Sequence, residues 1–114
     1  MLNLYSKIYN ELMYELSDEL KNNTDKQQEL LNCIECLPKG HINILNRNNK
    51  GYYYLTYRDG SKIKNKYLGV VGKVDLTETI SNLKKRESLV TEYKKLKQEE
   101  KKLNKLIKKY KWRN

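Results

Sequence analysis

The chain has 114 residues, enough for one domain, and only 38% of them are hydrophobic, so its core must be thin. Charged residues make up 33% of the sequence and the formal net charge is +10, which favours long solvated helices and argues against a protein that mimics DNA. No apolar run approaches the ~20 residues of a membrane-spanning helix, and the N-terminal segment carries acids among its apolar residues, unlike a signal peptide. We therefore expect a single cytoplasmic domain over residues 1–114, with no membrane partner and an elongated shape.

Residues 1–37 predict a helical segment. Between residues 3 and 22 the apolar side chains recur at steps of three and four, which places them on one stripe of an α-helix. The stripe consists of Tyr5, Ile8, Tyr9, Leu12, Met13, Leu16 and Leu20.

The helical pattern weakens at residues 22–24, and the sequence leaves open whether the helix breaks there or only softens. Thr24 followed by Gln27 has the spacing of a capping box, in which two side chains satisfy backbone amides at the start of a helix. A second helix would then continue as far as Pro38, which ends it because proline cannot extend a helix.

Residues 41–69 predict a three-stranded antiparallel β-meander. The segment His41–Arg47 alternates weakly between apolar and polar residues, and the turn-forming residues 48–51 lead into a tyrosine-rich strand. A third strand follows the turn at Asp59-Gly60. Three strands with one apolar face are about the minimum for independent stability.

The turn chemistry allows two registers for the second hairpin. Side chains alternate between the faces of a strand, so the lysines of the third strand share one face and Ile63 and Tyr67 share the other. A two-residue loop, Asp59-Gly60, would place the lysines opposite Tyr53, Leu55 and Tyr57. A three-residue loop that adds Arg58 would place them opposite Tyr52, Tyr54 and Thr56. Because a slip of one residue exchanges the two faces, the sequence does not decide which tyrosines are buried.

Residues 75–112 predict a long C-terminal helix. Asp75 followed by Glu78 has capping-box spacing, and from residue 89 the apolar positions step by four and three like a heptad repeat, with Glu100 as an interruption. Such a helix would be roughly 55 Å long and needs a partner helix to cover it. We therefore predict an α+β fold, helix, meander and long helix, whose helices form an antiparallel coiled-coil-like stalk. The expected seam is Leu76, Ile80, Leu83, Leu89, Val90, Tyr93, Leu96, Leu103, Leu106, Ile107 and Tyr110.

Basic side chains are concentrated in the predicted sheet and the last helix. Residues 1–36 hold three basic and seven acidic side chains, residues 37–74 hold eight and one, and residues 75–114 hold thirteen and six. The acidic first helix can pair with the basic last helix, whereas the excess in the sheet has no such partner.

This excess in the sheet predicts nucleic acid or a ribonucleoprotein as the partner. Lysine and arginine bind phosphates without reading sequence, a two-stranded ribbon fits the DNA major groove, and tyrosines stack on unpaired bases. The competing interpretation is that lysines on an edge strand only protect a small sheet from aggregation. The C-terminal run KKLNKLIKKYKWRN has the same ambiguity between a basic arm and the solvated end of a coiled coil. The expected binding residues are Arg47, Lys50, Tyr53, Tyr57, Arg58, Lys62, Lys64, Lys66 and Lys73.

The sequence offers no constellation for catalysis or metal binding. Cys33 and Cys36 have CxxC spacing, but they lie at the C-terminal end of a predicted helix, where the helix dipole disfavours a thiolate. His41 is the only histidine, so a structural zinc site would lack one ligand within the chain. We therefore expect free buried thiols, no metal, no cofactor and no enzymatic activity.

The sequence contains a set of short motifs in a fixed order: Leu37-Pro38-Lys39-Gly40, Tyr52-Tyr53-Tyr54-Leu55, Arg58-Asp59-Gly60, Lys62 and Lys66-Tyr67-Leu68-Gly69, followed by a charged helix. In these motifs the chain resembles a family of small uncharacterised proteins known chiefly from low-GC Gram-positive bacteria, their phages and mobile elements. The resemblance covers roughly residues 30–110 and implies a helix–hairpin–helix shape, but no activity. His41 departs from it, since a small residue is expected there. The hairpin alone is also similar to the small arm-binding sheet of phage-type tyrosine recombinases, which reads DNA.

The sequence thus favours a non-enzymatic basic module that contacts nucleic acid or a nucleoprotein through its hairpin. A second interpretation is a protein-binding inhibitor from a mobile element, such as an anti-CRISPR that docks on a bacterial nuclease complex. A third is a structural homodimer whose long helices pair.

Overall fold

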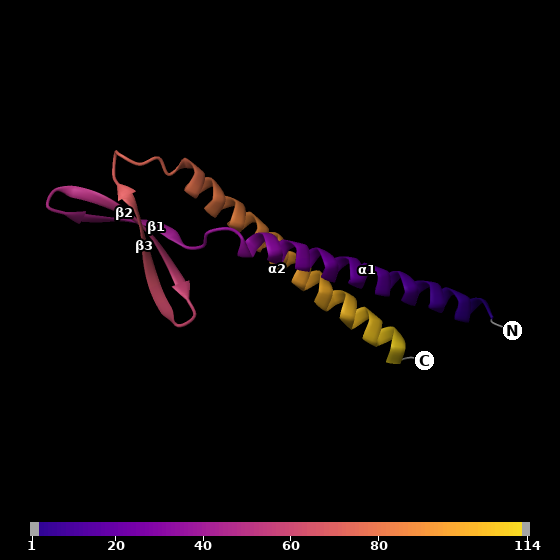
Figure 1. Cartoon of the computed structure of the whole chain (residues 1–114). Helices are drawn as coiled ribbons and strands as arrows, with labels where there is room; N and C mark the ends of the chain where they lie inside the picture. Colours follow the sequence, from indigo (N-terminus) through magenta and orange to yellow (C-terminus); the bar gives the residue numbers. More distant parts are fainter. Residues whose placement is uncertain (1–2, 113–114) are drawn as a thin grey trace. The chain divides into compact units, whose positions relative to one another are not determined.

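The computed structural model describes residues 3–112 and contains the predicted order of helix, three strands and helix. The elements are α1 (Leu4–Glu35), β1 (His41–Arg47), β2 (Lys50–Asp59), β3 (Lys62–Val70) and α2 (Thr77–Trp112), labelled in Figure 1. The chain divides into two compact units, and the division falls within α2. We call Met1–Ile34 with Leu89–Asn114 the helix unit, and Glu35–Ser88 the sheet unit. Neither of the two helices, as far as they are described, has the length and apolarity to cross a membrane.

Helix α1 is continuous over 32 residues, so the break considered at residues 22–24 does not occur and the capping box there is wrong. The Thr24 hydroxyl donates a hydrogen bond to the carbonyl of Lys21, 3.0 Å away, one turn back in the same helix. Gln27 is buried and its amide reaches Glu100 of α2. Thr24 and Gln27 resemble a helix start in the sequence because hydroxyl and amide side chains that cap helices also occur inside them.

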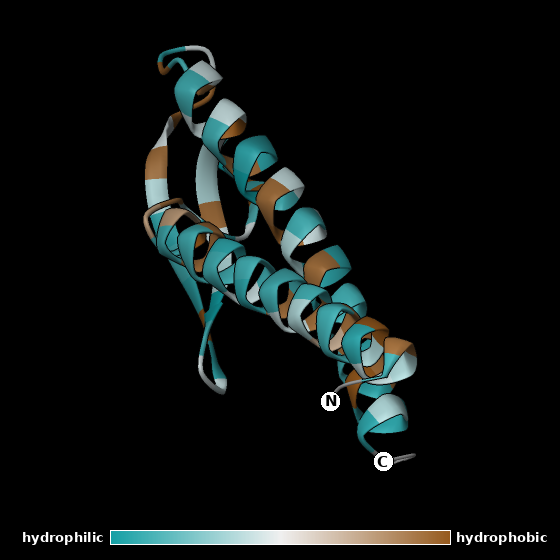
Figure 2. Cartoon of the chain, turned by 90° about the vertical axis from the view of Figure 1, so that its right-hand side faces the viewer, coloured by the Kyte–Doolittle hydropathy of each residue, from teal (hydrophilic) through white to brown (hydrophobic). Residues whose placement is uncertain are grey.

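In the helix unit, α1 and the C-terminal part of α2 run antiparallel, with the start of α1 and the end of α2 at the same end of the pair (Figures 1 and 2). Hydrophobic bands recur along both helices between longer hydrophilic stretches (Figure 2). The buried residues of α1 are Leu16, Asn23, Gln27, Leu30 and Ile34. The half-buried positions of α2 in this unit include Leu89, Tyr93, Leu96, Glu100, Leu103, Ile107 and Tyr110. Successive members of the two sets are three, four or seven residues apart, which is the spacing of a coiled-coil seam.

The predicted seam is wrong at two positions, because the side chains there are exposed. Leu106 is 40% exposed and Ile80 is 41% exposed. Leu106 lies directly beside Ile107, and on a helix neighbouring residues point about 100° apart, so only one of them can occupy the seam. At the other end of the pair, Leu4 and Tyr5 of α1 are also largely exposed.

A polar layer lies inside the apolar seam of the helix pair. The Asn23 amide donates to the carbonyl of Leu96 at 3.0 Å, and the Gln27 amide donates to Asn23 Oδ1 at 2.5 Å and to Glu100 Oε2 at 2.7 Å. The Lys97 ammonium lies 3.5 Å from the same carboxylate oxygen. The hydrogen bond from Gln27, and to a lesser degree the charge of Lys97, lower the pKa of Glu100 against the opposing effect of burial. Glu100 is therefore a partner of the buried amides and not an interruption of the seam.

The sheet unit contains one antiparallel sheet in the order β1-β2-β3. The first hairpin pairs Arg47 with Lys50 across the loop Asn48-Asn49, whose φ angles of 50° and 63° are those of a type I′ turn. Strands β2 and β3 pair in one register from Asp59↔Lys62 to Tyr54↔Tyr67. A bulge follows, after which Tyr53 pairs with Gly69.

The loop of the second hairpin is Gly60-Ser61, so neither expected register is exact. The two-residue alternative still assigned the faces correctly, because the observed register differs from it by two residues and Tyr53, Leu55 and Tyr57 share a face with the lysines of β3. Gly60 has a φ of 63°, which suits the first position of a two-residue hairpin loop. Asp59 stays within β2, where its carboxylate accepts a hydrogen bond from Lys64 at 2.7 Å. The expected loop residue is thus retained in the strand by a cross-strand ion pair.

Helix α2 begins at Thr77, and the expected capping box between Asp75 and Glu78 is replaced by contacts to Thr77. Asp75 Oδ1 accepts hydrogen bonds from the Thr77 amide at 2.9 Å and from the Thr77 hydroxyl at 2.5 Å. These two bonds lower the pKa of Asp75.

Gly40 should tolerate substitution much less than Gly60. A Cβ at Gly40 would lie 2.1 Å from the carbonyl oxygen of Thr56, whereas a Cβ at Gly60 would meet nothing within 4 Å. Both glycines have positive φ, which costs about 1–2 kcal/mol for alanine. We expect Gly60→Ala to lose about that amount and Gly40→Ala at least twice as much in the free energy of unfolding, measured by urea denaturation. Equal losses would contradict the close approach of Gly40 to β2.

Glu100 should make the stability of the helix pair depend on pH. Its pKa in the folded protein is lowered from the ordinary 4.5, so its stabilising effect is complete above that value and is lost as the pH falls through the lower, folded value. We expect the difference in unfolding free energy between the wild type and Glu100→Gln to be constant near neutral pH and to shrink in acid. Urea titrations followed by circular dichroism measure this difference. The matched variant Glu99→Gln removes a neighbouring carboxylate outside the polar layer and should be the less destabilising of the two at neutral pH.

Candidate nucleic-acid interface

The strand registers divide the side chains of the sheet between two faces, because residues directly opposite each other share a face and neighbours along a strand alternate. We call the first the lysine face; it carries Ile42, Ile44, Asn46, Tyr53, Leu55, Tyr57, Asp59, Lys62, Lys64 and Lys66. We call the second the tyrosine face; it carries His41, Asn43, Leu45, Arg47, Lys50, Tyr52, Tyr54, Thr56, Arg58, Ile63, Asn65, Tyr67 and Val70.

The lysine face holds the buried residue of the sheet, although Ile44 on the same face is 55% exposed. Leu55 is 6% exposed and is the only strand residue in the buried class among those described. Tyr53 and Tyr57 beside it are half-buried. The lysines of β3 stand at the edge of this face and are exposed, and one of them, Lys64, is already paired with Asp59.

The tyrosine face is open and aromatic. The Tyr67 ring lies between two others, with ring centroids 5.5 Å from Tyr54 and 6.3 Å from Tyr52, and both pairs are tilted. Tyr67 is 53% exposed and Ile63 on the same strand is 65% exposed. Large side chains that stay this accessible on a sheet indicate a surface available for contact.

A ladder of neutral polar groups crosses all three strands on the tyrosine face. The Asn43 amide donates to Thr56 Oγ1 at 2.6 Å, and the Thr56 hydroxyl donates to Asn65 Oδ1 at 2.7 Å. His41 Nε2 lies 3.3 Å from the Asn43 amide nitrogen. Thr56 thus uses both its donor and an acceptor within the ladder, whereas Asn43 Oδ1 and Asn65 Nδ2 have no partner among the described residues.

The expected binding residues are therefore divided between the two faces. Tyr53, Tyr57 and the three lysines of β3 lie on the lysine face, and Arg47, Lys50 and Arg58 lie on the tyrosine face. Lys73 belongs to the turn after β3, where its amide donates to the carbonyl of Val70 at 3.0 Å. Tyr52, Tyr54, Tyr67 and the polar ladder were not expected. Their position follows from strand alternation only when the register is known.

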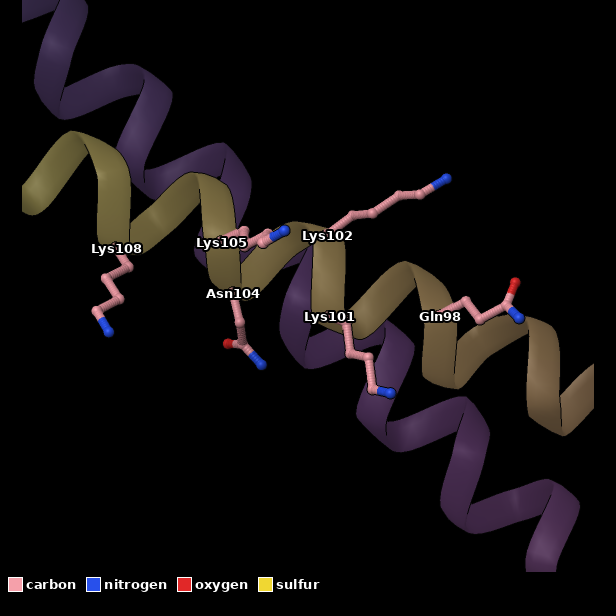
Figure 3. A pocket seen from close by; sticks show the side chains of 6 residues that line it. All are labelled: Gln98, Lys101, Lys102, Asn104, Lys105 and Lys108. Atoms are coloured by element: carbon pink, nitrogen blue, oxygen red, sulfur yellow. The ribbon is translucent and has the colours of Figure 1, made fainter.

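A second basic surface lies on α2. An open pocket there is lined by six side chains, and Figure 3 shows that all of them project from this one helix: Gln98, Lys101, Lys102, Asn104, Lys105 and Lys108. The apolar residues between them, such as Leu103 and Ile107, are half-buried and belong to the seam. This part of the C-terminal run therefore combines a coiled-coil seam with a solvated lysine surface, and residues 113–114 lie outside the described part.

The two cysteines are free, as expected, but they are exposed, so the expectation of buried thiols is wrong. The buried positions of α1 near them are Leu30 and Ile34, which leaves Cys33 off the seam. Among residues 3–112, no three His, Cys, Asp or Glu side chains gather in a group that would hold a metal ion.

The fold and these surfaces define a small basic α+β protein with an open three-stranded sheet. The profile of one family, described as Domain of unknown function (DUF6788), matches residues 15–78, more than half of the sequence, and the chain belongs to this family. The matched segment contains the whole sheet, starts earlier in α1 than the expected resemblance and ends at the second residue of α2. No curated protein and no solved structure matches the chain significantly.

Two neighbouring residues of β2 should show which face of the sheet is buried. Leu55→Ala should cost about 2–5 kcal/mol, because it empties the buried position of the lysine face. Thr56→Val should cost about 1 kcal/mol, because it breaks two hydrogen bonds of an exposed ladder whose partners regain water. Urea denaturation measures both losses. A larger loss for Thr56→Val than for Leu55→Ala would mean that the faces are assigned the wrong way round.

Proposed function

We propose that the protein binds nucleic acid, or a nucleoprotein through its nucleic acid, by means of the three-stranded sheet, with no catalytic step. The support comes from the balance of charge on the strands. They carry six exposed basic side chains and a single carboxylate, Asp59. That carboxylate is engaged by Lys64, so the other five cations have no ion-pair partner among the described residues.

An ordinary solvated surface would mix charges of both signs. The basic side chains of α2 up to Lys97 are interspersed with acids, and Lys97 itself is paired with Glu100. No acid follows Glu100 on α2, and the lysines beyond it form the competing basic surface. On the strands, the charge has no internal counterpart, and phosphate groups are the ligand that lysine and arginine bind in large number without a specific sequence. The proposal for binding residues covers Arg47, Lys50, Arg58, Lys62 and Lys66, with Lys73 at the edge.

Binding to labelled oligonucleotides at two salt concentrations tests the proposal. The probes are single-stranded DNA, single-stranded RNA and duplex DNA, and the readout is fluorescence anisotropy. Neutralising three phosphates on a single strand gives a slope of log affinity against log salt of about −2. We expect Arg58→Ala/Lys62→Ala/Lys66→Ala to weaken binding and to reduce this slope by at most that amount, because it removes three unpaired cations that lie on both faces of the sheet.

The triple variant Lys101→Ala/Lys105→Ala/Lys108→Ala is the matched control, since it removes the same charge from α2. It should keep most of the affinity. Equal losses in the two variants would move the interface away from the sheet. If the wild type binds none of the probes, the proposal fails, and the inhibitor and the structural dimer become the better interpretations.

A further inference from the structure

We infer that the tyrosine face is the contact surface and that its ligand is a single strand with unpaired bases, which stack on the Tyr67 cluster. This inference rests on the proposed function, because it specifies the form of the nucleic acid and the side of the sheet that meets it. It shifts the contact away from the lysine face, where most of the expected binding residues lie.

The first step is accessibility. The lysine face holds the buried Leu55, whereas none of the described strand residues on the tyrosine face is in the buried class. The rings of Tyr52 and Tyr54 are half-buried and support Tyr67 between them at 6.3 and 5.5 Å. A ring held in this way loses little freedom when a base stacks on it, and every base has a flat face that can do so.

The second step is the distribution of charge on this face. Arg47 and Lys50 lie where β1 meets β2, Arg58 lies at the opposite end of β2, and the face carries no carboxylate among the described residues. Lys50 and Arg58 are eight positions apart on β2, which corresponds to a distance of about 27 Å along the strand at 3.4 Å per residue. Cations at both ends and aromatic rings between them match a strand whose phosphates lie at the rim and whose bases lie on the sheet.

The third step is hydrogen bonding. The ladder across the three strands leaves Asn43 Oδ1 as an acceptor and Asn65 Nδ2 as a donor without a partner among the described residues. Amide groups of this kind pair with the edges of bases. In a duplex, the flat faces of the bases are stacked on one another and cannot reach Tyr67, so the surface offers more to an unpaired strand than to a duplex.

The test compares four probes of about 16 nucleotides, within the site sizes of small single-strand binders. They are a thymine DNA strand, a uracil RNA strand, the corresponding duplex, and a DNA strand whose central nucleotides lack bases. We expect the wild type to bind the strands with bases about tenfold or more tightly than the abasic strand and the duplex. The thymine and uracil strands are both included because stacking on Tyr67 requires a base and not a particular sugar.

The variant Tyr67→Thr removes the exposed ring and keeps a residue that favours strands. It should lose about 5- to 100-fold in affinity for the strands with bases and little for the abasic strand. The matched control is Tyr57→Thr, a tyrosine on the lysine face, which should change the affinity about twofold at most. Circular dichroism checks that both variants fold, and photo-crosslinking of an iodouracil strand to the wild type should label Tyr67 without any substitution.

The outcomes separate this inference from the proposed function. Equal binding of abasic and normal strands by the wild type, or equal losses in the two tyrosine variants, overturns the tyrosine face while leaving a sheet that binds phosphates. Crosslinks confined to Tyr53 or Tyr57 do the same. Absence of binding to every probe overturns the proposed function itself.

Discussion

The register of the β2–β3 hairpin decides which chemistry the sheet presents on each side. Pairing of Asp59 with Lys62 places Leu55 on the same face as the three lysines, and Tyr67 on the other. A slip of one residue between the strands would exchange these partners, because side chains alternate with a period of two. Leu55 is the only buried residue among the described residues of the strands, so apolar burial alone is a weak constraint on this register. The two hairpin loops and the ion pair between Asp59 and Lys64 add the local constraints that such a thin sheet requires.

In the helix pair, buried amides fix the register of the two helices. An apolar seam with a regular four-and-three spacing can slide by one heptad at little cost, whereas a buried amide cannot, since it must keep its hydrogen bonds. Asn23 and Gln27 are nearly inaccessible, and their partners on α2 are the carbonyl of Leu96 and the carboxylate of Glu100. A change of register would leave these groups buried without partners. The layer thus gives up some apolar burial and specifies one alignment of the two helices.

Sequence patterns predicted the elements well, because each element depends on local features. The alternation of residues 41–70, the asparagine turn and most of the seam of α2 appear in the structure at the expected places. The predictions failed where a side chain has two possible roles and a distant contact chooses between them. Gln27 was assigned to a helix start, but it reaches Glu100; Asp59 was assigned to a loop, but it pairs with Lys64. The sequence left the tyrosine face undecided for a related reason, since only one of the two loops that the turn chemistry allows gives the observed faces.

The basic side chains lie on both faces of the sheet, and this division affects how the sheet would bind a polyanion. A sheet is one layer thick, and charges on both of its faces contribute to the field that attracts a strand, although only one face can contact the bases. Lys62 and Lys66 would then raise the rate of encounter and the salt dependence, whereas Tyr67 would raise the affinity for unpaired bases over bare phosphates. These contributions respond to different probes, since removal of bases leaves the phosphates unchanged and added salt leaves the stacking surface unchanged. In an interface confined to the lysine face, the same residues would determine both the dependence on salt and the dependence on unpaired bases. The paired Lys64 and the half-buried Tyr57 would lie at its centre. The open ring of Tyr67, on a face that carries no described carboxylate, is what favours the divided arrangement.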